Sequence, residues 1–225
     1  MKKRLAGMVL ALASIVAAGA AQAGADAETD VSELNRQALI AVRGGNLPKL
    51  RDLLEHGASV DTRNRFGDSL LMTAIKSGSP DAVNALMARR PDVNLANTSQ
   101  VTPLMAAAFT GNVDAARMLL ERRADPAAAD RLHKTAMVYA AATGHAAIVA
   151  LLLDAGVDVN ARYENDLTAL MWAAGGGHAD TVRLLLARGA DGALADNRGK
   201  TALQIATDNR HAEADELLRT GGAMK

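Results

Sequence analysis

From about residue 32 onward, short apolar runs at helical spacing alternate with polar segments. The stretch 100–132 is representative. Its first run follows Thr102, a good N-cap residue, and reaches about Phe109 or Thr110 before Gly111 permits a sharp reversal. A second run then places apolar residues on one helical face at Ala115, Ala116, Leu119 and Leu120. The pattern predicts an all-α unit of two short antiparallel helices followed by a projecting loop.

This unit recurs with a fixed period of 33 residues, which three independent sets of positions mark. A hydroxyl residue opens each first helix, at Ser69, Thr102, Thr135, Thr168 and Thr201. A glycine keeps the same period at the end of a first helix, at Gly45, Gly78, Gly111, Gly144 and Gly177. Apolar pairs mark the second helix, at Leu53-Leu54, Leu86-Met87, Leu119-Leu120, Leu152-Leu153 and Leu185-Leu186. A period of this size predicts a solenoid of stacked repeats, an architecture that commonly binds other macromolecules.

The unit resembles the ankyrin repeat over about residues 32–222. Residues 102–112 read TPLMAAAFTGN, residues 144–161 read GHAAIVALLLDAGVDVNA, and residues 177–191 read GHADTVRLLLARGAD. The proline typical of the family survives only at Pro103, and other residues replace the motif histidine throughout. The resemblance implies an ankyrin-repeat solenoid of stacked helix-turn-helix units with projecting loops. It also implies that a partner protein binds the concave helix face and the loop tips.

The period divides the chain into successive units. Residues 32–57 resemble a first unit that lacks its loop, and residues 200–218 end on a polar outer face, as terminal repeats do. The expected divisions are an N-terminal capping unit over 32–66, repeats over 67–99, 100–132, 133–165 and 166–198, and a C-terminal capping unit over 199–222.

The first residues have a different composition. Lys2, Lys3 and Arg4 precede an apolar run that ends at Ala21-Gln22-Ala23. This layout is typical of a secretory signal peptide over 1–23, followed by a short linker over 24–31. An uncleaved membrane anchor is the alternative, because the run is almost long enough to span a bilayer. A second, weaker cleavage motif is Ala25-Asp26-Ala27. Cleavage predicts a periplasmic chain beginning at Gly24, with no membrane association thereafter.

Composition narrows the partner classes. The chain has 25 basic and 25 acidic residues, and removal of residues 1–23 leaves 22 basic residues, a net charge of −3. Such a balance gives no support for a nucleic acid or an anionic membrane as partner. The chain contains no cysteine, which excludes disulfides and a lipoprotein anchor. We expect a monomer that binds another protein.

No pattern indicates catalysis, a cofactor or a metal site. His145, His178 and His211 keep the 33-residue spacing, but equivalent positions in stacked repeats lie roughly 8–10 Å apart, too far to share a zinc ion. We therefore expect these histidines to close the turns between helices. The same separation argues against a copper site and favours core packing for three methionines, Met72, Met105 and Met171.

The five aromatic residues of the chain show a more informative distribution. Counted from the opening hydroxyl residue, Tyr139 and Trp172 are at position +4 and Phe109 is at +7, opposite the small core residues of the first helix. The alternative is that residues at +4 are half-buried between neighbouring repeats. Aromatic side chains are enriched among interface anchors. The candidate partner-binding residues are Phe66, Phe109, Arg131, Lys134, Tyr139, Tyr163 and Trp172, with Phe66 and Tyr163 at loop tips.

These observations predict a non-enzymatic scaffold, exported to the bacterial periplasm, that binds a partner protein. An accessory protein that protects a stress enzyme, or an inhibitor that neutralises a toxin, would have the same sequence features. An enzyme with a cryptic site would require a closed pocket with convergent titratable groups. An effector delivered to a host is disfavoured by the secretory signal.

Overall fold

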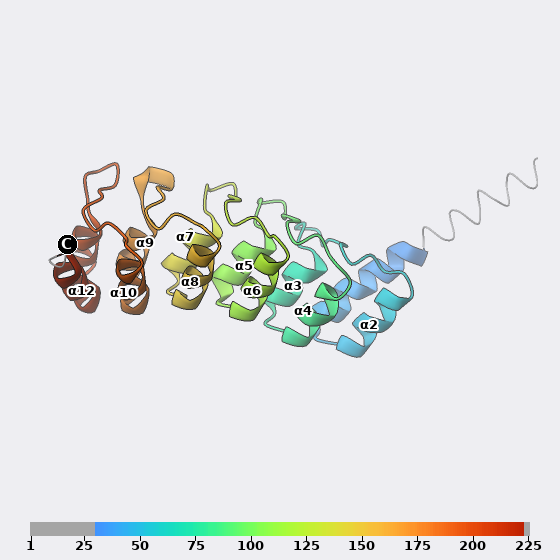
Figure 1. The fold of residues 1–225 in the computed structure, drawn as a ribbon. Helices are drawn as coiled ribbons and strands as arrows, with labels where there is room; N and C mark the ends of the chain where they lie inside the picture. Colours follow the sequence, from blue (N-terminus) through green and yellow to red (C-terminus); the bar gives the residue numbers. More distant parts are fainter. Residues whose placement is uncertain (1–29, 223–225) are drawn as a thin grey trace, which may run out of the picture.

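A computed structural model describes residues 30–222 of the chain. Within that range the protein is all-α, without a β-strand, and its helices form a single elongated stack (Figure 1). The helices are residues 30–43, α2 (Leu47–Glu55), α3 (Leu70–Lys76), α4 (Pro80–Met87), α5 (Pro103–Thr110), α6 (Val113–Glu121), α7 (Ala136–Ala142), α8 (Ala146–Asp154), the 3-10 turn η1 (Glu164–Asp166), α9 (Ala169–Gly175), α10 (Ala179–Ala187), α11 (Ala202–Asp208) and α12 (Ala212–Gly222).

Local sequence explains where the helices begin and end. In α5, the Thr102 side chain accepts a hydrogen bond from the Met105 backbone N–H, and Pro103 occupies the first turn, where its missing N–H costs nothing. Gly111 ends this helix in the left-handed conformation, with φ at 73°. The same hydroxyl cap begins α3, α7, α9 and α11, so the predicted helix starts are confirmed.

The core is continuous from one repeat to the next. Leu104, Ala107 and Ala108 on α5 are fully buried, as predicted. Met105 and Ala106 on the same helix are also buried, because neighbouring first helices flank α5 on both sides. Met72, Met105 and Met171 all lie in the core, which confirms their predicted packing role. On α6, Leu119 is buried, whereas Leu120 is only half-buried.

The loops all project from one side of the stack, next to the first helix of each repeat (Figure 1). Most of these loops are closed by hydrogen bonds to the backbone and the side chain of one Asn or Asp. In the loop before α5, the Asn97 backbone N–H donates to the Val101 carbonyl oxygen, and the Asn97 side-chain oxygen accepts from the Ser99 and Val101 N–H groups. Asn64 makes the same bonds in the loop before α3. The prediction that the first unit lacks its loop is therefore wrong.

The predicted signal peptide and most of the linker lie outside the described residues. Among residues 30–222, none of the helices has both the length and the apolar character needed to cross a bilayer.

Candidate functional site

Three aromatic residues from successive repeats form a row along the first helices. The rings of Phe109 on α5 and Tyr139 on α7 make an edge-to-face contact, with centroids 5.9 Å apart and planes at 85°. The Lys134 ammonium bridges the next step, because its Nζ lies 5.9 Å from the Tyr139 ring and 5.7 Å from the Trp172 ring on α9. We call Phe109, Tyr139 and Trp172 the aromatic ledge.

The three members of the aromatic ledge differ in exposure. Phe109 is 58% exposed, whereas Tyr139 and Trp172 are half-buried and pack against the core. The expectation that all three project into solvent is therefore wrong for Tyr139 and Trp172. A first helix has a neighbour on each side, so a residue at position +4 is partly covered by the adjacent repeats. The Trp172 indole nitrogen is buried and has no hydrogen-bond partner.

Hydrogen bonding fixes the centre of the aromatic ledge. The Tyr139 hydroxyl donates to Asp130 Oδ2 at 2.6 Å. Burial and this bond to a carboxylate raise the pKa of Tyr139 to about 12. Burial alone would raise the pKa of Asp130, but the bonds from Tyr139 and from the Lys134 and Leu132 backbone N–H groups hold it below its usual value. Asp130 thus connects the ring of Tyr139 to the loop that carries Lys134.

The remaining predicted residues lie apart from the aromatic ledge. Phe66 is 57% exposed at the tip of the first loop, where the Arg65 guanidinium stacks 4.7 Å from its ring centroid. Arg131 is exposed on the loop next to Lys134. Tyr163 is half-buried rather than at an exposed loop tip, and its hydroxyl is inaccessible to solvent. The prediction for Tyr163 is corrected accordingly: its ring lines a cavity between two loops.

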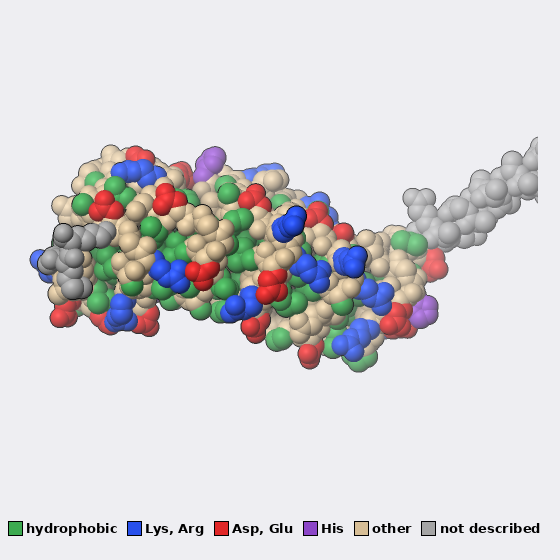
Figure 2. All heavy atoms as spheres, viewed as in Figure 1, with side chains coloured by type: hydrophobic (Ala, Val, Ile, Leu, Met, Phe, Trp, Pro, Cys, Tyr) green, Lys and Arg blue, Asp and Glu red, His purple; other side chains and the backbone are tan. Residues whose placement is uncertain are grey.

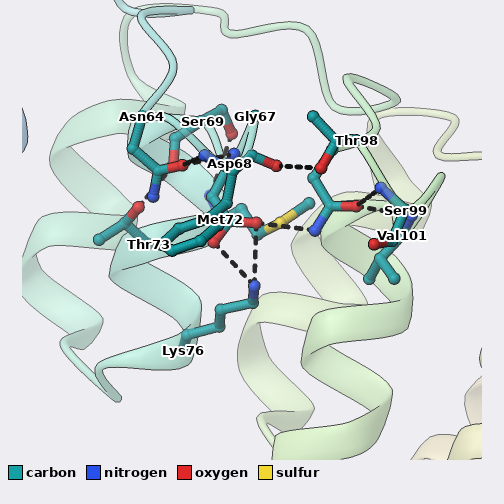
Figure 3. Close-up of polar contacts among 12 residues, drawn as sticks. Asn64, Gly67, Asp68, Ser69, Met72, Thr73, Lys76, Thr98, Ser99 and Val101 are labelled. Carbon is teal, nitrogen blue, oxygen red and sulfur yellow. Dashed lines mark hydrogen bonds and ion pairs between the residues drawn. The ribbon is translucent and has the colours of Figure 1, made fainter.

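An ion pair replaces the apolar surface at the N-terminal end of the row. Lys76 on α3 occupies the repeat position of Phe109, and its Nζ lies 2.9 Å from Asp68, directly before the N-cap Ser69 (Figure 3). The Asn97 side chain also donates to Asp68, at 2.8 Å. Burial acts to raise the pKa of Asp68, but the bonds from Asn97 and Lys76 outweigh it and lower that pKa.

A second ion pair occupies the same two repeat positions at the C-terminal end, where Lys200 Nζ lies 2.6 Å from Asp208. Polar pairs thus close both ends of the row, and the aromatic side chains are confined to the central repeats. That ion pairs bound the aromatic row was not predicted from the sequence. The signal is present in the 33-residue period, because Asp68 and Lys76 align with Lys200 and Asp208. Elsewhere, charges of both signs are scattered along the stack (Figure 2).

The periodic histidines connect adjacent repeats. The His178 ring lies 2.9 Å from the Ala142 carbonyl oxygen of the preceding repeat, and His145 and His211 make the equivalent contacts at 3.3 and 3.1 Å. We expected these rings to close the turns between helices, and each ring contacts the end of the first helix of the preceding repeat, directly before its turn. Within residues 30–222, no three His, Asp or Glu side chains converge as a metal site would require.

Comparison with known proteins agrees with this architecture. A family model described as ankyrin repeats (3 copies) matches residues 38–130, 90–163 and 137–223. These overlapping matches span residues 38–223, well over half of the 225-residue chain. No curated protein matches the chain.

Proposed function

The chain belongs to the ankyrin-repeat family, whose members generally mediate protein–protein binding, and we propose that it is a non-enzymatic scaffold that binds a partner protein through the aromatic ledge. The observation that carries this proposal is the continuity of Phe109, Tyr139 and Trp172 across three repeats. A large apolar surface bordered by polar groups is typical of a protein-binding site.

The electrostatics of the aromatic ledge indicate which partner groups it suits. Lys134 and Arg131 form no ion pair with any described residue, whereas Lys76 and Lys200 at the two ends are both paired. An acidic side chain beside an apolar anchor would therefore complement the centre of this surface. Such charges orient the partner and raise the association rate more than they raise the affinity.

Phe109 is the best residue with which to test the proposal, because it is the exposed member of the aromatic ledge. Phe109→Ala should weaken binding of a partner captured by the wild-type chain by about 2 kcal/mol, roughly 30-fold. Its effect on the free energy of unfolding should be about 1 kcal/mol or less, since the exposed ring loses mainly its edge contact with Tyr139. Titration calorimetry and thermal denaturation measure the two effects.

Phe66→Ala supplies the matched control, because Phe66 is equally exposed but lies on a loop tip two repeats away from Tyr139. We expect this variant to change affinity by less than about 1 kcal/mol, as is common for residues outside an interface centre. Equal losses of affinity in the two variants would mean that the aromatic ledge is not the centre of binding.

We also propose that the scaffold acts in the bacterial periplasm. Support comes from the basic start, the apolar run and the Ala21-Gln22-Ala23 motif of the sequence. The mature chain is then expected to begin at Gly24 and to occur in the soluble periplasmic fraction. Intact-mass measurement on fractionated cells checks this; a full-length species in the membrane pellet would instead indicate an uncleaved anchor.

A further inference from the structure

Neighbouring loops are normally joined near their bases by one side-chain oxygen. Asn94 Oδ1 accepts from the Asp125 backbone N–H at 2.8 Å, and Asn160 Oδ1 accepts from the Asp191 N–H, also at 2.8 Å. Asp61 Oδ1 makes the equivalent bond in the first pair of loops. Both asparagines also direct their side-chain nitrogen to a carbonyl oxygen just after the second helix of the following repeat, that of Arg123 or Gly189, 3.5 Å away.

The tips of neighbouring loops are joined as well, by a backbone hydrogen bond. The Thr98 N–H donates to the Phe66 carbonyl oxygen. In the next pair of loops, the Arg131 backbone N–H donates to the Ser99 carbonyl oxygen. After one interruption, the bond recurs at the C-terminal end of the stack, from the Asn197 N–H to the Asn165 carbonyl oxygen at 3.0 Å. Base and tip bonds therefore recur in register with the repeats.

One pair of loops lacks both bonds. No backbone hydrogen bond joins residues 122–135 to residues 155–168. At the base, Ala127 occupies the position of Asn94 and Asn160 and has no polar group to offer. The Asp158 N–H and the Gly156 carbonyl oxygen, which such a side chain would contact, lie on exposed residues and have no hydrogen-bond partner among residues 30–222.

The backbone at this junction nevertheless keeps the geometry of the occupied ones. The Val157 N–H donates to the carbonyl oxygen of Leu152 at 3.1 Å, as Ala190 does to Leu185 at 2.9 Å one repeat later. Gly156 has φ at 92°, close to the 89° of its counterpart Gly189. The unpaired donor and acceptor are therefore held in the arrangement that Asn160 bridges in the next repeat.

A cavity of about 350 Å³ opens at the same junction, lined among others by Ala127, Gly156, Asp158 and Tyr163. Tyr163 occupies the repeat position of the loop-closing Asn97 and Asp130, so the usual side-chain closure of this loop is missing. The Tyr163 hydroxyl is buried beside Thr135, and burial raises the pKa of Tyr163. The walls thus combine apolar surface with the unpaired Asp158 N–H and Gly156 carbonyl oxygen.

We propose that this cavity binds the primary carboxamide of an Asn or Gln side chain presented by a bound protein segment. The inference depends on the proposed function only in taking that segment from the protein partner; none of the residues of the aromatic ledge lines the cavity. The carboxamide oxygen accepts from the Asp158 N–H, and its nitrogen faces the Gly156 carbonyl oxygen. Asn160 already binds in this way one repeat later.

The hydrogen-bonding groups of the cavity favour a carboxamide over a carboxylate. The unpaired backbone groups are one donor and one acceptor, and a carboxylate could satisfy only the donor. At the first junction the Asp61 carboxylate does accept the Asp92 N–H, but it has no donor for the facing carbonyl oxygen. Pro126, Val157 and Ala161 supply apolar surface for the methylene groups of the bound side chain.

The test uses isobutyramide as probe and the methyl ester of isobutyric acid, which has no N–H group, as its control. In ¹⁵N-resolved NMR spectra of the mature chain, isobutyramide should produce saturable shifts of the Asp158 and Val157 amide signals, with roughly millimolar affinity for so small a ligand. The ester should not. Equal shifts with both compounds, or no saturable shift with isobutyramide, would overturn the proposal.

Ala127→Asn places the protein's own carboxamide in the cavity. This variant should lose the isobutyramide response and gain roughly 2–4 °C in Tm, because it restores a bond that the other junctions have. Ala127→Leu has the same branching without polar atoms and should lose the response without that gain. An Ala127→Asn variant that still responds to isobutyramide would contradict the proposed site.

Phe109→Ala separates this proposal from the proposed function, because it alters the aromatic ledge and leaves the cavity intact. Its amide signals should shift with isobutyramide as in the wild type. In the wild-type chain, an isobutyramide response without any protein-binding activity would disprove the role of the aromatic ledge alone. An absent response in a wild-type chain that binds its partner would disprove the carboxamide site alone.

Discussion

Replacing Leu152 with alanine is expected to lower the free energy of unfolding by about 2–5 kcal/mol. Leu152 lies on α8 and is fully buried in the continuous core. Truncation removes apolar contacts and leaves a cavity that the flanking repeats can fill only in part, because each helix is held by neighbours on both sides. Urea denaturation followed by circular dichroism measures the loss.

Leu132→Ala is the matched control for this substitution. It deletes the same atoms, but Leu132 lies on a loop and is 61% exposed. We expect its effect to stay within about 0.5 kcal/mol, as for most surface substitutions. Similar denaturation midpoints for the two variants would mean that the assigned core is wrong.

Replacing Gly144 with alanine is expected to destabilise the chain by about 2–4 kcal/mol, for two reasons. Gly144 has φ at 78°, where a residue with a Cβ pays roughly 1–2 kcal/mol. In addition, the new Cβ would lie 2.6 Å from Nδ1 of His178, whose ring cannot move away without losing its contact with the Ala142 carbonyl oxygen. Overpacking of this kind costs roughly a further 1–3 kcal/mol.

Gly78→Ala isolates the backbone part of that effect. Gly78 occupies the same repeat position with φ at 64°, but nothing lies within 4 Å of a Cβ built there. The Gly78 variant should therefore lose only about 1 kcal/mol, since alanine also restricts the unfolded chain. If thermal denaturation gives equal losses for the two variants, the histidine contact contributes nothing to the stacking of repeats.

Sequence predicted the features that depend on local chemistry. The limits of α5 follow from Thr102, Pro103 and Gly111, all of which act within one turn of the helix end. The loop of the first unit was missed because it is held partly by the next repeat, through the bond from Thr98 to the Phe66 carbonyl oxygen. A local pattern does not contain that partner.

The aromatic residues show the same limit. The helical angle of position +4 places Tyr139 and Trp172 opposite the buried face of their own helix. It contains no information on the adjacent first helices, which cover part of each ring. The unbridged junction depends on Ala127 and Tyr163. Their effect could not be predicted from sequence, because it follows from the hydrogen bonds that Asn94 and Asp130 make at the same repeat positions. Both features arise from packing between repeats.

Site-specific photo-crosslinking most directly tests whether the aromatic ledge binds a partner. A benzophenone amino acid would replace Phe109 in one variant of the full chain and Ile40 in another. Ile40 is equally exposed, at 58%, but lies on the helix of residues 30–43 at the N-terminal end of the stack. Irradiation in living cells should give a defined adduct with one protein from position 109 and none from position 40. The same adducts from both positions, or no adduct from position 109, would contradict the proposal.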